Sequence, residues 1–188
     1  MHLVLIGPPG CGKGTQATRV AAARAVPHIS TGDILRHAVA SGSMLGEAVA
    51  DAMSRGELVS DEIITDLVAE RLADLDAKSG FVLDGFPRTV EQGIALDILM
   101  EERGGLAVVE LTAPDDELVR RLARRRTIEG RVDDEESVVR ERLAVYRKST
   151  APVLEFYRRR GALLTLNGDL PPEAVTQLIL REVESIHV

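Results

Sequence analysis

A lysine stands among four glycines near the start of the chain, in the run Gly7–Thr15 with the sequence GPPGCGKGT. The run follows a short apolar stretch and precedes a segment with helical character. Backbone N–H groups in such a loop bind anions, together with the positive end of the next helix. Glycine permits positive φ angles and leaves no side chain between backbone and phosphate. We therefore expect a phosphate-binding loop, with Lys13 near the β- and γ-phosphates of a nucleoside triphosphate. The alternative is a glycine turn that only packs a helix against a strand.

The loop departs from its commonest form at one position. That form has Ser or Thr directly after the lysine, whereas this chain has Gly14 there and Thr15 next. We therefore assign no direct magnesium contact to this position. Asp84 closes a later apolar run and is the candidate for orienting magnesium, through water, beside a triphosphate. The alternative for Asp84 is a structural role, in which its carboxylate caps neighbouring loop amides.

Short apolar runs without polar alternation recur along the chain and predict buried parallel strands. They are Leu3–Ile6, Phe81–Asp84, Leu106–Leu111 and Ala162–Leu166, with Val26–Ile29 as a short fifth. Helical segments lie between them, beginning with about Lys13–Arg24. The last helix opens at Pro171–Pro172 and has an apolar stripe of Val175, Leu178, Ile179, Val183 and Ile186. This alternation predicts an α/β fold with a doubly wound, five-stranded parallel sheet.

The strand ends indicate where a ligand would bind. Ligands of doubly wound sheets gather at the carboxyl ends of the strands, which is where Gly7, Asp84 and Gly168 fall. Two stretches exceed a minimal strand–helix repeat. Residues 30–59 contain two helical patterns, Asp33–Ala40 and Gly46–Met53, and residues 126–137 are polar and charged. We interpret both as inserts on a single core domain spanning residues 1–188, and as candidate mobile flaps at the rim of the sheet.

Composition excludes several classes of protein. The 188 residues carry a formal net charge of −7 and only 3% aromatic side chains, which argues against a nucleic-acid partner and an anionic membrane surface. The single cysteine, Cys11, excludes an intramolecular disulfide and a multi-cysteine zinc site. The N-terminus lacks the basic stretch of a signal peptide, and no apolar run has membrane-spanning length. We expect a cytoplasmic, monomeric protein.

Several motifs together resemble those of the nucleoside monophosphate kinases, most closely the adenylate kinases. They are Gly7–Thr15 followed by Gln16, Ser30–Arg36, Leu83–Arg88, Gly130–Asp134 and Tyr146–Pro152. The motifs occur in the expected order and span the chain from the first strand to the last helix. The resemblance implies a P-loop NTPase fold with a helical acceptor-nucleotide flap at 30–59 and a short lid at 126–137. It implies a lid without structural zinc.

The resemblance also implies an AMP site. Thr31 and Gln92 would contact the adenine, and Arg36 and Arg88 the AMP phosphate. The other implied AMP-site residues are Glu57, Leu58, Val59, Gly85, Phe86 and Pro87. Two of these assignments have structural alternatives. Thr31 could cap the helix that begins near Asp33, and Gln92 could close a capping box with Thr89.

On the ATP side, the resemblance implies contacts from Gly10, Cys11, Gly12, Lys13, Gly14, Thr15, Arg125 and Gly168. Arg131 and Arg142 resemble the pair that clamps the transferring phosphoryl group and the AMP phosphate. Some of the neighbouring arginines, Arg120, Arg121, Arg124 and Arg126, are interpreted as solvated helix residues. The four histidines show no ligand spacing, so we assign them no role.

The implied reaction is reversible transfer of the γ-phosphoryl group of magnesium ATP to AMP, giving two ADP. Its transition state is loose and in-line, so catalysis is mainly positioning and charge stabilisation. Five cations would surround the migrating group: Lys13, Arg88, Arg125, Arg131 and Arg142. Two alternatives are a UMP/CMP kinase, which shares this outline, and a regulatory nucleotide-binding module, which needs no acceptor pocket.

Overall fold

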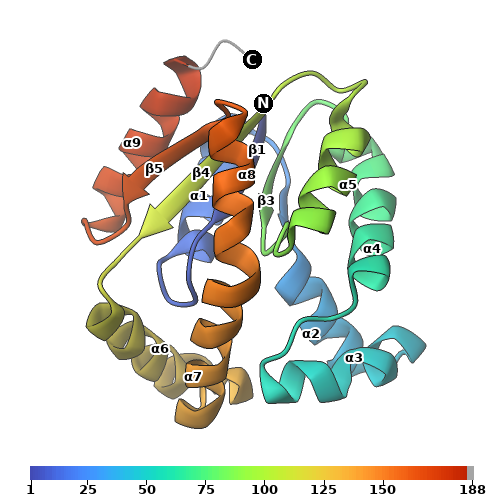
Figure 1. Ribbon diagram of the computed structural model, residues 1–188, viewed down its shortest axis with the longest axis vertical. Helices are drawn as coiled ribbons and strands as arrows, with labels where there is room; N and C mark the ends of the chain where they lie inside the picture. Colours follow the sequence, from blue (N-terminus) through green and yellow to red (C-terminus); the bar gives the residue numbers. More distant parts are fainter. Residues whose placement is uncertain (186–188) are drawn as a thin grey trace.

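The computed structural model describes residues 1–185 and has a five-stranded parallel sheet at its centre (Figure 1). The strands are β1 (His2–Ile6), β2 (His28–Ser30), β3 (Phe81–Asp84), β4 (Leu106–Thr112) and β5 (Leu163–Asn167). Their order across the sheet is β2-β3-β1-β4-β5, and every neighbouring pair is parallel. The predicted doubly wound α/β fold is confirmed.

Alternate residues of the central strand β1 face two separate apolar clusters. Val4 and Ile6 join a cluster with α2 (Thr31–Ser41), α3 (Met44–Arg55), α4 (Asp61–Ala73), α5 (Val90–Met100) and α8 (Ala151–Arg159). Leu3 and Leu5 join a second cluster with α1 (Lys13–Arg24), α6 (Asp115–Glu129), α7 (Glu136–Val145) and α9 (Pro172–Ser185). All four side chains are buried. Burial on both faces explains the unbroken apolar run in the sequence.

The edge strand β2 begins later than the sequence predicted. We expected a strand over Val26–Ile29, but it spans His28–Ser30. The N–H of Val26 still donates to Ala21 O at the end of α1. Pro27 has no N–H to donate to a ladder, although its carbonyl already accepts from Val82 N at 2.9 Å. Regular pairing can therefore start only after Pro27.

The region 30–59 forms two short helices that pack closely. The side chains of Ser30 and Ser43 cap α2 and α3 by accepting hydrogen bonds from Asp33 N and Gly46 N. The capping alternative for Thr31 is therefore wrong, because Ser30 holds that position and Thr31 is the first residue of the helix. A Cβ on Gly46 would lie 2.1 Å from Ala38 O, so a glycine is required at this contact.

The polar region near residue 130 links α6 to a long helix. Helix α6 continues to Glu129 and stops at Gly130, which has a φ of 65°. The 3₁₀ turn η2 (Val132–Asp134) follows, and then α7 runs through a π-helical segment, Tyr146–Thr150, into α8. Figure 1 shows α7 and α8 as one continuous helix crossing the molecule.

Helix α9 places three members of its predicted stripe, Val175, Ile179 and Val183, in the second apolar cluster, but Leu178 is not part of that cluster and Leu180 packs against it instead. Ile186, the last member of that stripe, lies outside the described residues. Within residues 1–185, no helix combines the length and apolarity that crossing a membrane requires.

Candidate active site

One large cleft opens at the carboxyl ends of the strands, with a volume of about 990 Å³. All the residues assigned above to ATP, AMP or magnesium line it, from Gly10 in the glycine loop to Gly168 after β5. They come from segments far apart in the sequence, including α2, the segment after β3, α6 and α7. The topology thus brings the predicted site residues together, as expected for the edge of a doubly wound sheet.

The glycine loop between β1 and α1 uses one of its amides internally, because Cys11 N donates to Pro8 O at 3.2 Å. Gly10 and Gly12 have φ angles of 87° and 99°, which favour glycine. No side chain caps α1 at Gly12, so the first amides of the helix remain available as donors. Lys13 Nζ folds back on the loop and donates to Gly7 O at 2.7 Å and to Pro8 O at 3.0 Å. Among the described residues, no carboxylate lies within 4 Å of this ammonium group.

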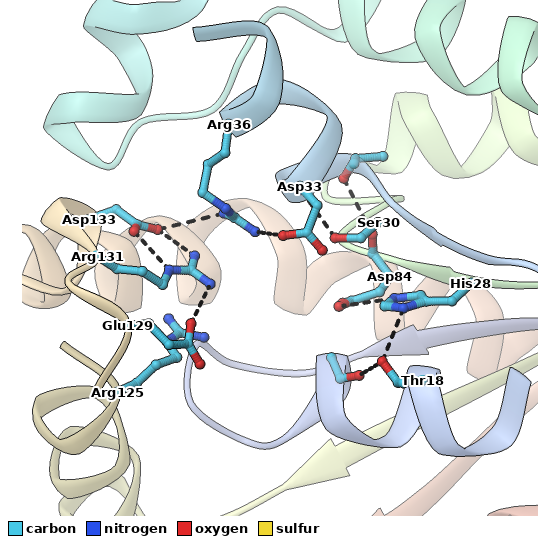
Figure 2. A network of polar contacts seen from close by, with 12 residues as sticks. Thr18, His28, Ser30, Asp33, Arg36, Asp84, Arg125, Glu129, Arg131 and Asp133 are labelled. Carbon is cyan, nitrogen blue, oxygen red and sulfur yellow. Dashed lines mark hydrogen bonds and ion pairs between the residues drawn. The ribbon is translucent and has the colours of Figure 1, made fainter. Parts of the chain in front are cut away.

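Asp84 faces the glycine loop from the end of β3 (Figure 2). A Cβ on Gly14 would lie 3.5 Å from Asp84 Oδ2, so the carboxylate borders the start of α1. His28 Nε2, on the neighbouring strand β2, lies 4.0 Å from the same oxygen, and His28 Nδ1 lies 3.3 Å from Thr18 Oγ1. We assigned His28 no role from the sequence, yet it borders the candidate magnesium-orienting carboxylate.

Arg88 is a partly buried cation. Its Nε donates to Gly85 O at 2.7 Å, and no carboxylate of residues 1–185 lies within 4 Å of its guanidinium group. Burial lowers the pKa of Arg88, and the nearby charges of Arg36 and Arg131 act in the same direction, while Asp84 and Asp133 partly oppose them. Removing a charge from water is costly when nothing pairs with it, so this partly buried position favours an anionic ligand.

The other predicted arginines are held by aspartates of the η2 turn, and Figure 2 shows two of these pairs, Arg131 and Arg36 with Asp133. Arg125 makes two hydrogen bonds of 2.6 Å to Asp134, whose side chain is fully buried. Arg131 pairs with Asp133 at 2.8 Å, and Arg142 contacts both aspartates. Arg36, on α2, lies between Asp33 and Asp133. Four arginines, from α2, α6, the link between α6 and η2, and α7, thus converge on one group of carboxylates.

This convergence shifts the pKa values of both an aspartate and an arginine of the group. Burial alone would raise the pKa of Asp133, but the hydrogen bond from Arg131 and the charges of Arg142, Arg131 and Arg36 hold it well below its usual range. Burial lowers the pKa of Arg142 to about 10, and the charges of Arg125 and Arg88 add to this effect. A multiply charged anion entering the cleft would meet several cations already in place.

Gln92 and Thr31 lie on the acceptor side with contacts of their own. Gln92 Oε1 accepts from Arg88 N at 2.7 Å, and Gln92 Nε2 donates to Asp61 Oδ1 at 2.6 Å. Thr89 caps α5 as the capping box predicts, but Gln92 reaches back one residue further than that motif requires. Thr31 Oγ1 donates to Asp84 O at 3.4 Å.

Comparison with known proteins identifies the family. The family model described as "Adenylate kinase" matches residues 5–162. The chain belongs to the adenylate kinase family. Adenylate kinase 1 of a Nostoc species is 50% identical over 177 residues, covering 93% of this chain and 94% of the relative. The adenylate kinases of Micrococcus luteus and Thermobifida fusca are 45% and 46% identical over 187 residues, 98% of this chain; the matches cover 91% and 99% of those relatives.

Membership in the adenylate kinase family makes the chain a phosphotransferase that acts on ATP and AMP. It also decides between the alternatives drawn from the sequence, because the relatives reported above are named adenylate kinases rather than UMP/CMP kinases. A purely regulatory nucleotide-binding module is likewise disfavoured. In the part of the chain that the structure describes, no group of three or more His, Cys, Asp or Glu side chains is arranged to hold a metal ion.

Sequence reasoning missed several residues of this adenylate kinase cleft. Arg121 was given no role of its own within the arginine cluster, but it donates to Gly168 O at 3.0 Å and pairs with Asp169, so it fixes the segment after β5. Gln16, quoted only as part of a motif, donates to Pro172 O at 3.0 Å and accepts from Thr176 at 2.7 Å. The arginine-rich stretch offered no local signal to separate Arg121 from its neighbours.

Proposed function

We propose that this adenylate kinase transfers the terminal phosphoryl group of ATP to AMP within the cleft, giving two ADP. ATP would lie on the glycine loop, with Lys13 and the amides of Gly10–Thr15 around its β- and γ-phosphates. Arg125 and Gly168 would lie beside the rest of ATP. AMP would lie opposite, between α2 and the segment after β3. The oxygen of the AMP phosphate is the nucleophile, so no covalent intermediate with the protein is required.

The observation that carries this proposal is the environment of the Arg88 guanidinium group. It is partly buried, its pKa is lowered, and it lines the cleft. An arginine fork matches two phosphate oxygens, and binding an anion would offset the cost of its burial. Arg36 and Arg142 line the same region, so three cations could share the AMP phosphate and the migrating phosphoryl group.

The aspartates of η2 would act as temporary partners of the arginines. Asp133 and Asp134 hold Arg125, Arg131 and Arg142 in position. Phosphate oxygens would take over some of these bonds when the nucleotides enter. Arg131 and Arg142 would then stabilise the charge that develops on the transferred group.

Magnesium fits this site as the companion of ATP. Mg²⁺ prefers one or two carboxylates together with substrate phosphates and several waters, and Asp84 is a partly buried carboxylate that borders Gly14. Asp84 would hold the ion through water. The ion would supply charge stabilisation between the β- and γ-phosphates.

The side-chain amide of Gln92 has unused hydrogen-bonding positions that could contact the adenine of AMP. A primary amide has two N–H donors and an acceptor oxygen with two lone pairs. One donor is used on Asp61 and one lone pair on Arg88 N, which leaves one of each for the base. Thr31 and the backbone of Glu57–Val59 would complete the adenine site.

The two inserts, 30–59 and 126–137, would act as flaps that close over the reactants. Closure would exclude water, which otherwise competes with AMP for the phosphoryl group. The monomeric state, the cytoplasmic location, and the lack of a nucleic-acid partner and of zinc stay predictions from the sequence.

The test of this proposal measures the binding of AMP and of ATP separately. We expect Arg88→Met to weaken AMP binding by about tenfold or more, the range for a hydrogen-bonded charge, and to leave ATP binding nearly unchanged. The measurement is separate calorimetric titration with AMP and with ATP. Arg140→Met is the matched control, because Arg140 is exposed and pairs with Glu136 on α7. Equal losses for both nucleotides, or no loss for AMP, would contradict the assignment.

A further inference from the structure

The long helix that follows the η2 turn contains an unusual segment. Helix α7 continues through the π-helical residues Tyr146–Thr150 into α8, and both junction residues, Tyr146 and Ala151, have right-handed helical backbone angles. π-Helical turns are rare in proteins overall, and those that occur often lie at functional sites. Pro152 follows just after the segment, and its missing N–H interrupts the regular hydrogen-bond ladder of the helix at this place.

Thr150, the last residue of the π-helical segment, uses its hydroxyl outside its own helix. Threonine within a helix often bonds back to the carbonyl one turn earlier. Here Thr150 Oγ1 instead donates to Arg88 O at 3.1 Å, across 62 positions of sequence. Thr150 is 6% exposed and lines the cleft. A buried hydroxyl at the end of the π-helical segment therefore bonds to the main chain of Arg88, the arginine proposed to bind the AMP phosphate.

The main chain of Arg88 is fixed from both sides by side chains. Its N–H donates to Gln92 Oε1 at 2.7 Å, while its carbonyl accepts from Thr150. Its own Nε is tied to Gly85 O at 2.7 Å. A site that is already ordered binds its ligand more tightly, because less conformational entropy is lost on binding.

We propose that Thr150 is a positioning residue for AMP: its hydroxyl holds the Arg88 main chain so that the guanidinium group stays aimed at the acceptor phosphate. This inference rests on the proposed function, which assigns Arg88 to AMP. The helix that carries Thr150 also carries Arg142, eight residues earlier on α7. One continuous helix therefore positions two cations of the acceptor site. It carries Arg142 itself, and it holds Arg88 through the hydrogen bond from Thr150.

A purely structural role for Thr150 makes a different prediction. If the hydroxyl only satisfied a buried carbonyl, its loss would lower the stability of the fold and would affect both nucleotides alike. A positioning role predicts a selective loss for AMP. The two roles are separated by comparing AMP with ATP, with stability measured in parallel.

The experiment uses variants that isolate the hydroxyl. Thr150→Val keeps the shape of the side chain and removes the hydroxyl, whereas Thr150→Ser keeps the hydroxyl and removes the methyl group. We expect Thr150→Val to raise the Kd and KM for AMP about threefold to tenfold, the range for one hydrogen bond, with the ATP constants unchanged. Thr150→Ser should bind AMP as the wild type does. If Thr150→Val does not fold, Thr150→Ala replaces it, because Ala and Ser differ only by the hydroxyl.

The outcomes separate failure of this inference from failure of the proposed function. If Arg88→Met weakens AMP binding and Thr150→Val does not, Arg88 binds AMP but Thr150 does not position it. Equal losses for AMP and ATP in Thr150→Val would also overturn the inference, as would a Thr150→Ser variant as weak as Thr150→Ala. If Arg88→Met leaves AMP binding intact, the assignment of the acceptor site itself is wrong.

Discussion

A Cβ atom on Gly85 would lie 2.6 Å from the hydroxyl oxygen of Thr31 and 3.2 Å from Arg88 Nη2. Gly85 also has a φ of 86°, in the region that favours glycine. The position therefore requires glycine for two separate reasons, backbone conformation and the space beside two residues of the proposed AMP site.

We expect Gly85→Ala to impair AMP binding selectively. The new methyl group would displace Thr31 or Arg88, while the strained backbone would lower the free energy of unfolding by about 1–3 kcal/mol. AMP and ATP titrations, together with urea denaturation, measure both effects.

Gly104→Ala is the matched control for this variant. Gly104 has nearly the same φ, 87°, but nothing lies within 4 Å of the place that a Cβ atom would occupy there. It should lose comparable stability and keep normal AMP binding. An equal AMP defect in Gly104→Ala would show that backbone strain alone accounts for the result.

Replacing Lys13 by methionine tests the phosphate loop. The variant removes the charge that folds over Gly7 and Pro8, so we expect the rate of ADP formation to fall about a hundredfold or more, as when a stabilising group at a reacting centre is lost. Lys78→Met is the control, because Lys78 is exposed after the 3₁₀ turn η1 (Leu75–Ala77). Near-normal phosphoryl transfer by Lys13→Met would refute the role of the loop.

The lowered pKa of Asp133 predicts how the free energy of unfolding depends on pH. Its pKa is held below its usual range in the folded protein, so its ion pairs stabilise the fold fully above about pH 4, the ordinary aspartate value. Their contribution is lost as the pH falls through the lower, folded-state pKa. The difference in free energy of unfolding between the wild type and Asp133→Asn should therefore be largest near neutral pH and should shrink below pH ~4.

Urea denaturation at several pH values checks this difference. Asp66→Asn, on the exposed side of α4, controls for the loss of one surface carboxylate. A wild-type advantage over Asp133→Asn that stays constant down to low pH would show that the arginine cluster does not stabilise the charged form of Asp133.

Helix α5 offers a test of the packing that supports the cleft. Leu96 is fully buried in the first apolar cluster, whereas Ile98 on the same helix is 60% exposed. Leu96→Ala should lower the free energy of unfolding by about 2–5 kcal/mol, since it leaves a cavity. Ile98→Ala should change it by about 0.5 kcal/mol or less. Similar losses at the two sites would contradict the observed burial.

Features set by adjacent residues were predictable from the sequence. The apolar run Leu3–Ile6 and the glycine loop after it specify strand, turn and helix within one short segment, and the structure has each in place. The helix predicted over Lys13–Arg24 has those bounds. Even where prediction was wrong, the cause was local: Ser30 and Thr31 are both good capping residues, and only the backbone shows that Ser30 takes that position.

Features set by distant residues were not predictable in this way. Nothing near Thr150 in the sequence indicates that its hydroxyl would reach Arg88, or that the helix would widen there. The pairing of Arg125 with Asp134 likewise depends on how α6 and η2 meet in space. The resemblance to the adenylate kinases pointed to arginines that line the cleft, but the aspartates that hold them were recognised only in the structure.

The central claim is that this chain transfers a phosphoryl group from ATP to AMP. The most direct measurement is a coupled assay of ADP formation with magnesium ATP as donor and AMP, CMP, UMP or GMP offered separately as acceptor. The account predicts rapid ADP formation with AMP and much slower turnover with the other three. A clear preference for CMP or UMP, or no ADP formation with any acceptor, would contradict it.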